Sequence, residues 1–151
     1  MRYFEDFSVG QVTEVGPVTV SEAEIVEFAS RYDPQPFHVD PEAAKASPFG
    51  GLIASGWHTT ALFMGMFVRG ILSESASLGS PGVEEIRWTA PVRPGDNLSA
   101  RSTVTDARPT RHTSLSIVKL GTQDRRSHAS IEPRRARRPA GDHRGATSPP
   151  A

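Results

Sequence analysis

An aspartate and a histidine stand five positions apart in this sequence, at Asp33 and His38, and two prolines lie between them. Each proline fixes its own φ at about −65° and biases the residue before it toward an extended backbone. The segment 33–40 is therefore predicted to be a rigid ledge. A carboxylate and an imidazole held at a fixed separation can bind a water molecule and move its protons. The spacing predicts a site for the addition or removal of water.

Helix signals lie on both sides of this ledge. Ser21 and Glu24 have the spacing of a capping box, in which each side chain bonds a free backbone N–H of the other residue. The amphipathic helix that starts there is predicted to end at the pair Asp33–Pro34. Asp40 precedes a proline and is predicted to cap a second short helix over residues 41–46. The ledge is thus expected to connect two helices.

The rest of the chain predicts one buried helix and a sheet. Residues 49–56 form a glycine-rich turn, and the stretch 57–72 is apolar almost all round, which is typical of a helix buried on most sides. The remaining β-forming stretches predict strands in the ranges 12–20, 83–90, 98–107 and 113–120. This order of elements indicates an α+β fold with an antiparallel sheet.

Three stretches carry a family resemblance. They are the segment 33–40, the glycine-ended segment 49–56, and the strand and turn at 87–96. In this order they resemble the MaoC-like dehydratases, which include the (R)-specific enoyl-CoA hydratases. The resemblance covers about residues 10–120. It implies a hot-dog fold, in which an antiparallel β-sheet wraps around a central α-helix.

The resemblance also implies a reaction. Asp33 and His38 would be the catalytic pair of a hydro-lyase that hydrates a trans-2-enoyl thioester of coenzyme A or of acyl-carrier protein to the (R)-3-hydroxyacyl thioester. The backbone N–H of Gly56, at the start of the central helix, would stabilise the enolate on the thioester oxygen, and glycine there would let the substrate approach the backbone closely. Ser55 and His58 would line the pocket. No cofactor and no metal are expected, and the protein is expected to form a homodimer.

The same residues have structural interpretations. Asp33 before a proline is a common helix terminator, His38 is compatible with a hydrogen-bonded, half-buried histidine, and Ser55 is suited to an N-cap. Asp40 is expected to cap a helix and not to act in catalysis. Gln35 stands where the family usually has asparagine, and Ser55 where it often has histidine. Two other functions therefore stay open: a hot-dog acyl-CoA thioesterase, and a catalytically impaired acyl-CoA-binding paralogue.

The chain changes character near Gly121. The residues after position 120 contain seven arginines against three acidic residues and few large apolar side chains. A hot-dog domain over 1–121 and a basic, disordered tail over 122–151 are therefore expected. The last strand of the family sheet is expected to be missing or degraded, because Pro133 could not continue an interior strand. The change has the character of a shifted reading frame or a degraded terminus.

The composition indicates which cell compartment and which kinds of partner to expect. The chain has no cysteine, which excludes disulfides and thiolate chemistry. It shows neither a secretory leader pattern nor an apolar run of about 18 residues, so a cytoplasmic protein without membrane contact is expected. The arginine run at 134–138 has no stacking aromatics beside it, which favours a solvated tail over a nucleic-acid contact.

Overall fold

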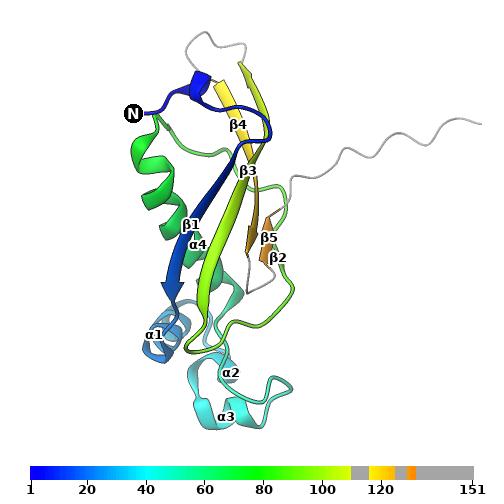
Figure 1. Cartoon of the computed structure of the whole chain (residues 1–151). Coiled ribbons are helices and arrows are strands. Elements are labelled where there is room, and N and C mark those ends of the chain that lie inside the picture. Colours follow the sequence, from blue (N-terminus) through cyan, green and yellow to red (C-terminus); the bar gives the residue numbers. More distant parts are fainter. Residues whose placement is uncertain (110–115, 125–128, 132–151) are drawn as a thin grey trace, which may run out of the picture.

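The computed structural model describes residues 1–109, 116–124 and 129–131, and within them one antiparallel sheet packs against one long helix (Figure 1). The strand order is β1-β3-β4-β5-β2, and each neighbouring pair is antiparallel. The strands are β1 Val12–Thr19, β2 Arg87–Trp88, β3 Asn97–Pro109, β4 Ser116–Asp124 and β5 Ala129–Ile131. The helices are α1 Glu22–Tyr32, α2 Pro36–Val39, α3 Pro41–Lys45 and α4 Gly56–Gly70, with short 3-10 turns at Phe4–Asp6 and Leu72–Glu74. The expected α+β fold is confirmed.

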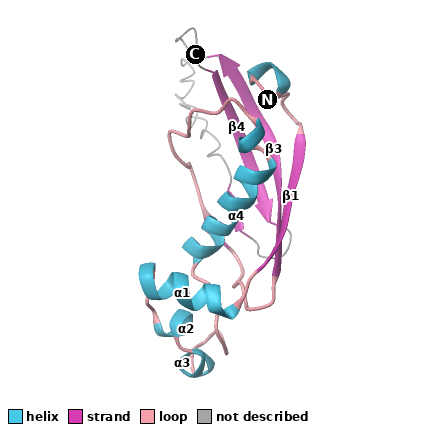
Figure 2. Cartoon of the chain, turned by 90° about the vertical axis from the view of Figure 1, so that its left-hand side faces the viewer, coloured by secondary structure: helices cyan, strands magenta, loops and turns pink. Residues whose placement is uncertain are grey.

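Three helices gather at one end of the sheet. Figure 2 shows α1, α2 and α3 together beyond the N-terminal end of α4, which runs along the sheet. Helix α1 begins where the capping box predicts: the Ser21 Oγ accepts from the Glu24 N–H at 3.2 Å, and the Glu24 carboxylate accepts from the Ser21 N–H at 3.0 Å. An N-cap of this kind stabilises a helix by about 1 kcal/mol. Ile25 and Ala29 of α1 are fully buried, which fixes this helix against the core.

Helix α4 approaches the sheet closely because glycines leave room. A β-carbon at Gly70 would lie 2.6 Å from the Val15 Cγ1, and one at Gly16 would lie 2.8 Å from the Met66 Sδ. These distances are shorter than any real carbon contact, so a side chain at either position would push α4 away from β1. The core between them is apolar. It includes Val15, Val20, Ile25, Leu52, Met66, Ile71, Val92 and Leu98.

One face of α4 is more exposed than its sequence predicts. Trp57, Met64 and Val68 lie along one side of this helix, and each is more than 40% exposed. The sheet covers only the opposite side, and no other described element of the chain covers this one. The expectation of a helix buried on most sides is therefore wrong for the single chain. We name these three residues the α4 stripe.

The end of the sheet differs from its expected boundary. Strand β4 continues to Asp124, past the expected domain end at residue 121. Strand β5 is only three residues long, yet it lies inside the sheet and pairs with both β4 and β2. The last strand is thus short rather than absent. The rest of the expected disordered tail falls at 125–128 and 132–151, outside the described residues.

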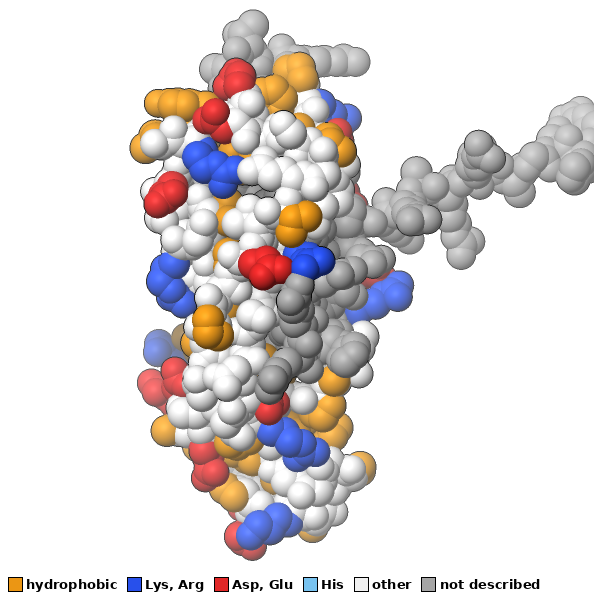
Figure 3. All heavy atoms as spheres, viewed as in Figure 1, with side chains coloured by type: hydrophobic (Ala, Val, Ile, Leu, Met, Phe, Trp, Pro, Cys, Tyr) orange, Lys and Arg blue, Asp and Glu red, His pale blue; other side chains and the backbone are white. Residues whose placement is uncertain are grey.

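The surface carries mixed charge. On the face seen in Figure 3, the described Lys and Arg side chains alternate with Asp and Glu side chains and form no large patch of one sign. Across the described residues, no helix is both long enough and apolar enough to cross a membrane.

Candidate functional site

Asp33 ends helix α1 and at the same time presents its carboxylate. Its N–H donates to the Ala29 carbonyl at 2.8 Å, as the last helical bond, while its own backbone leaves the helix with a φ of −154°. The two interpretations of this residue, helix terminator and site carboxylate, are therefore compatible. Pro34 follows it and prevents the helix from continuing.

His38 lies on a single helical turn and not on an extended ledge. Helix α2 starts at Pro36, whose fixed φ suits the first position of a helix. The imidazole is 95% buried, and its Nδ1 lies 2.7 Å from the carbonyl oxygen of Ile53. A carbonyl only accepts, so Nδ1 carries the proton. In the neutral ring, Nε2 is then an acceptor, and it lies 3.5 Å from Asp33 Oδ2.

Ser55 joins the ledge to helix α4. Its Oγ donates to Asp33 Oδ2 at 2.6 Å and accepts from the Trp57 N–H at 3.2 Å, so the same hydroxyl caps α4 and holds the carboxylate. The backbone around it is also tied down, because the Ile53 N–H bonds the Phe37 carbonyl and the Ala54 N–H bonds the Val92 carbonyl. The N-cap interpretation of Ser55 is confirmed, and the same hydroxyl also bonds Asp33.

Gln35 is part of the candidate site, and this role was not expected from the sequence. Its Nε2 donates to Asp33 Oδ1 at 2.8 Å. The bond from Ser55 and then the bond from Gln35 lower the pKa of Asp33 below its usual value, against a smaller opposing effect of burial. Asp33 is therefore ionised at neutral pH. The sequence signal for this role was the amide side chain of Gln35, a hydrogen-bond donor two residues after a carboxylate.

The facing atoms of Asp33 and His38 suit a ligand that donates hydrogen bonds to both. Both facing atoms, Oδ2 of the carboxylate and Nε2 of the neutral imidazole, accept hydrogen bonds, and neither can donate to the other. A water molecule has two hydrogens and can donate one to each. Since Nδ1 is held by Ile53 and both carboxylate oxygens are held by Ser55 and Gln35, the two acceptors are fixed before any ligand arrives.

Gly56 follows Ser55 as the first residue of α4, so its N–H belongs to the turn whose donors have no acceptor within the helix. The sequence analysis expected glycine here to leave room for substrate. The structure differs, because the indole of Trp88 fills that room: a β-carbon on Gly56 would lie 2.5 Å from the Trp88 Cδ2. Glycine is required at this position by a neighbouring side chain of the protein itself.

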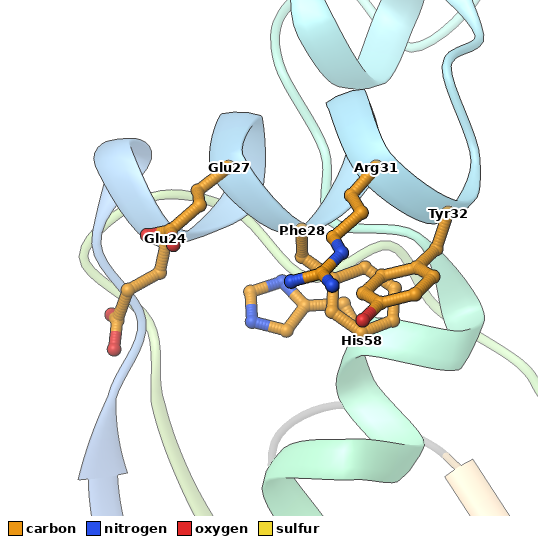
Figure 4. A pocket seen from close by; sticks show the side chains of 6 residues that line it. All are labelled: Glu24, Glu27, Phe28, Arg31, Tyr32 and His58. Atoms are coloured by element: carbon orange, nitrogen blue, oxygen red, sulfur yellow. The ribbon is translucent and has the colours of Figure 1, made fainter.

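His58 lines a separate hollow. Figure 4 shows its ring stacked on Phe28, with a centroid distance of 4.8 Å, beneath side chains from α1. The hollow has a volume of about 220 Å³ and is lined by Glu24, Glu27, Phe28, Arg31, Tyr32 and His58. Burial lowers the pKa of His58, and Glu24 opposes this effect. None of Asp33, His38 and Ser55 lines this hollow, so His58 does not share it with them.

One other expectation has a clear outcome in the described residues. Asp40 caps α3, because its Oδ1 accepts from the Glu42 N–H at 2.8 Å and from the Ala43 N–H at 3.2 Å. No group of three or more histidine and acidic side chains in the described part of the chain could hold a metal ion. The site consists of Asp33, His38, Ser55 and Gln35 beside the start of α4.

The chain resembles several known proteins in sequence. A family model described as a MaoC like domain matches residues 6–125. The uncharacterized protein YdeM of Bacillus subtilis is 33% identical over 109 residues, which are 72% of this chain and 77% of that protein. An (R)-specific enoyl-CoA hydratase of Rhodospirillum rubrum is 32% identical, over 72% of this chain and 74% of that one.

A solved structure shows the same fold. The crystal structure of a MaoC-like dehydratase from Rhodospirillum rubrum superposes with a TM-score of 0.69 at 35% sequence identity. The match covers 84% of this chain and 92% of that one.

Proposed function

Because the chain belongs to the MaoC-like dehydratase family, we propose that it is a hydro-lyase that reversibly hydrates a trans-2-enoyl thioester to the (R)-3-hydroxyacyl thioester. The substrate would be an acyl-CoA or an acyl-carrier-protein thioester. The name of the Rhodospirillum rubrum relative, an (R)-specific enoyl-CoA hydratase, supports this choice of reaction and stereochemistry. No cofactor is needed, because water addition to an activated double bond requires only proton transfer and charge stabilisation.

One observation carries the proposal. The Nε2 of His38 and the Oδ2 of Asp33 lie 3.5 Å apart, and both accept when the imidazole is neutral. The imidazole is held through Nδ1 by the Ile53 carbonyl, and the carboxylate is held by Ser55 on Oδ2 and by Gln35 on Oδ1. This arrangement suits a water molecule that donates to both. An ordinary structural histidine–aspartate pair would instead share a proton directly, with the imidazole ring donating to the carboxylate.

The proton transfers of hydration can all be carried out by groups within the site. The water oxygen forms a bond to C3 of the substrate and gives up one proton. His38 Nε2 receives that proton, because the two hydrogen bonds on Asp33 make its carboxylate the weaker base. The resulting imidazolium is stabilised by the Ile53 carbonyl on Nδ1 and by the Asp33 carboxylate on Nε2. The proton on Nε2 is next transferred to C2, and the site returns to its starting state. Dehydration is the same path in reverse.

The enolate between these two steps needs a hydrogen-bond donor on the thioester oxygen. The Gly56 N–H would supply this donor, since it opens a 15-residue helix whose dipole favours negative charge at this end. Its chain neighbour Ser55 bonds Asp33, so the amide is one residue away from a side chain that contacts the carboxylate. Loss of one such donor typically lowers kcat by about 10² to 10³.

The exposed apolar surface supports a homodimer. Trp57 of the α4 stripe meets Trp88, which is 44% exposed and belongs to strand β2 at one end of the strand order. A second copy of the chain would remove this apolar surface from water. Measurement of the mass in solution tests this part. A monomer at micromolar concentration would contradict it.

Crotonyl-CoA hydration, followed by the loss of enoyl-thioester absorbance, tests the reaction. Asp33→Asn and His38→Ala should each lower kcat by at least about 10², since each removes one of the two groups that handle the water proton. Asp40→Asn is the matched control, because Asp40 is a carboxylate nearby that only caps a helix. Full activity in both site variants would contradict the proposed residues. Release of free coenzyme A would indicate a thioesterase, and tight binding without turnover an impaired paralogue.

A further inference from the structure

We propose that Trp88 is a positioning residue that holds the Gly56 amide in the orientation in which it stabilises the enolate. This inference rests on the proposed role of Gly56. Trp88 lies 32 positions further along the chain, on the two-residue strand β2. It has no place in the acid–base chemistry, and its indole reaches Gly56 by two separate routes.

The first route is direct packing. A β-carbon built on Gly56 would lie 2.5, 2.6 and 3.0 Å from the Trp88 Cδ2, Cε2 and Cε3, three atoms of the fused ring. The face of the indole therefore rests on the α-carbon of Gly56. Only a hydrogen fits between them, so any movement of Gly56 toward β2 meets the ring. The contact is tight, and the atoms that make it belong to the rigid fused ring.

The second route is a chain of hydrogen bonds. The Trp88 Nε1–H donates to the Thr60 Oγ1 at 3.2 Å, and the Thr60 hydroxyl donates to the Gly56 carbonyl at 3.0 Å. The Thr60 hydroxyl has a single hydrogen, so the direction of the chain is fixed once it bonds the carbonyl. The indole thus acts on the α-carbon of Gly56 by contact and on its carbonyl through Thr60.

These contacts fix the amide from one side, and Ser55 fixes it from the other. The N–H of Gly56 belongs to the peptide between residues 55 and 56. On the Ser55 side, the Oγ is bonded to Asp33 and to the Trp57 N–H. On the Gly56 side, the α-carbon and the carbonyl are held by Trp88 and Thr60. A peptide held at both ends cannot rotate without breaking one of these contacts, so its N–H is oriented in advance of substrate binding.

Strand β2, which carries Trp88, is held in place by β5, the last strand that the structure describes. Strand β2 pairs with β5, with Trp88 opposite Ala129 and Arg87 opposite Ser130. The indole is otherwise open: it is 44% exposed, and its aromatic neighbour is Trp57, which it meets edge to face at 5.3 Å. The short last strand therefore bears on the site, because it holds the strand from which Trp88 reaches Gly56.

Conservative variants separate positioning from folding. Trp88→Phe keeps an aromatic ring and removes the Nε1 donor, and Thr60→Val removes the hydroxyl with little change of shape. Each should lower kcat for crotonyl-CoA about tenfold, because a slightly misdirected donor stabilises the enolate less well. KM should change less than twofold, since the ground state of the substrate is bound as before. Thr60→Ser keeps the hydroxyl and should restore kcat.

Ser73→Ala is the matched control, because Ser73 makes the same kind of hydroxyl-to-carbonyl bond, to Arg69, at the far end of α4. It should leave kcat unchanged. Each variant is checked for wild-type mass in solution and for its melting temperature. If Trp88→Phe and Thr60→Val keep wild-type kcat while Asp33→Asn is inactive, Trp88 is only structural and this inference is wrong. If the wild-type protein hydrates no enoyl thioester, the proposed function itself fails.

Discussion

Ser55 offers the sharpest test of the site, because one hydroxyl makes two bonds with separable consequences. It accepts from the Trp57 N–H as the N-cap of α4, and it donates to Asp33 Oδ2 at 2.6 Å. Ser55→Ala removes both bonds. Loss of an N-cap costs about 1 kcal/mol. Loss of a hydrogen bond to a charged group costs about 1.5 kcal/mol, the lower end of the usual range, because the Asp33 side chain is 22% exposed.

Ser55→Gly separates the two losses. Glycine is tolerated at an N-cap at a cost of only a few tenths of a kcal/mol, yet it also lacks the hydroxyl that bonds Asp33. The alanine variant should therefore lose about 2.5 kcal/mol of stability and the glycine variant about 1.8 kcal/mol. At about 4 °C per kcal/mol, these losses correspond to melting temperatures about 10 °C and about 7 °C below that of the wild type.

The pH dependence gives the second readout. The Ser55 bond is the largest cause of the lowered pKa of Asp33, so both variants raise that pKa toward its usual value. The acid limb of the Asp33 titration, followed by the NMR signal of its carboxyl carbon, should move to higher pH by the same amount in both. In the wild type, a lowered carboxyl pKa stabilises the fold above the unfolded-state pKa of 3.8, and this contribution is lost as the pH falls through the folded-state value.

Differential scanning fluorimetry and an NMR titration of the Asp33 carboxyl provide the measurements. Asp40→Ala is the control, since it removes an N-cap from α3 without touching Asp33. It should lower the melting temperature by about 4 °C and leave the acid limb in place. The reasoning is refuted if Ser55→Gly leaves the acid limb unmoved while Ser55→Ala shifts it. The same holds if Asp40→Ala shifts the limb as much as the Ser55 variants do.

Three further predictions concern single side chains. Gly56→Ala should lower kcat at least about 10², because the new β-carbon would lie 2.5 Å from the Trp88 ring and α4 must shift; a crotonyl-CoA assay measures this. Gln35→Leu should raise the pKa of Asp33 by removing its second donor, and an NMR titration of the carboxyl measures this rise. Burial lowers the pKa of His58, so the unfolded chain binds a proton first and stability falls as the pH drops below the unfolded-state value of 6.5. His58→Phe should reduce the loss of melting temperature between pH 7 and pH 5, and an unchanged loss would contradict this.

Local features of the chain were predictable because neighbouring residues produce them. The capping box of Ser21 and Glu24 and the N-cap of Asp40 involve partners no more than three positions away, and both form as predicted. The family resemblance added the fold, which the comparison with a solved MaoC-like dehydratase confirms. The prolines of the ledge were recognised, although a helical turn at Pro36 replaced the extended segment.

Contacts between distant parts of the chain were not predictable from the pattern. Gln35 was a departure from the family motif in sequence, and only the structure shows its amide on Asp33. Gly56 was explained by the approach of substrate, whereas Trp88 fills that space. The α4 stripe was expected to be buried, because an apolar sequence cannot indicate which side of a helix the sheet will leave uncovered.

By itself, then, the sequence determined where helices start and stop, which residues could carry the chemistry, and the family to compare. Short-range bonds decide those features, so the residues that form them stand next to each other in the chain. Tertiary structure alone decided that Ser55 bonds Asp33 across 22 positions and that Trp88 rests on Gly56. The physical reason is packing: such contacts exist only after α1, α4 and the sheet have docked, and their distances depend on every side chain between them.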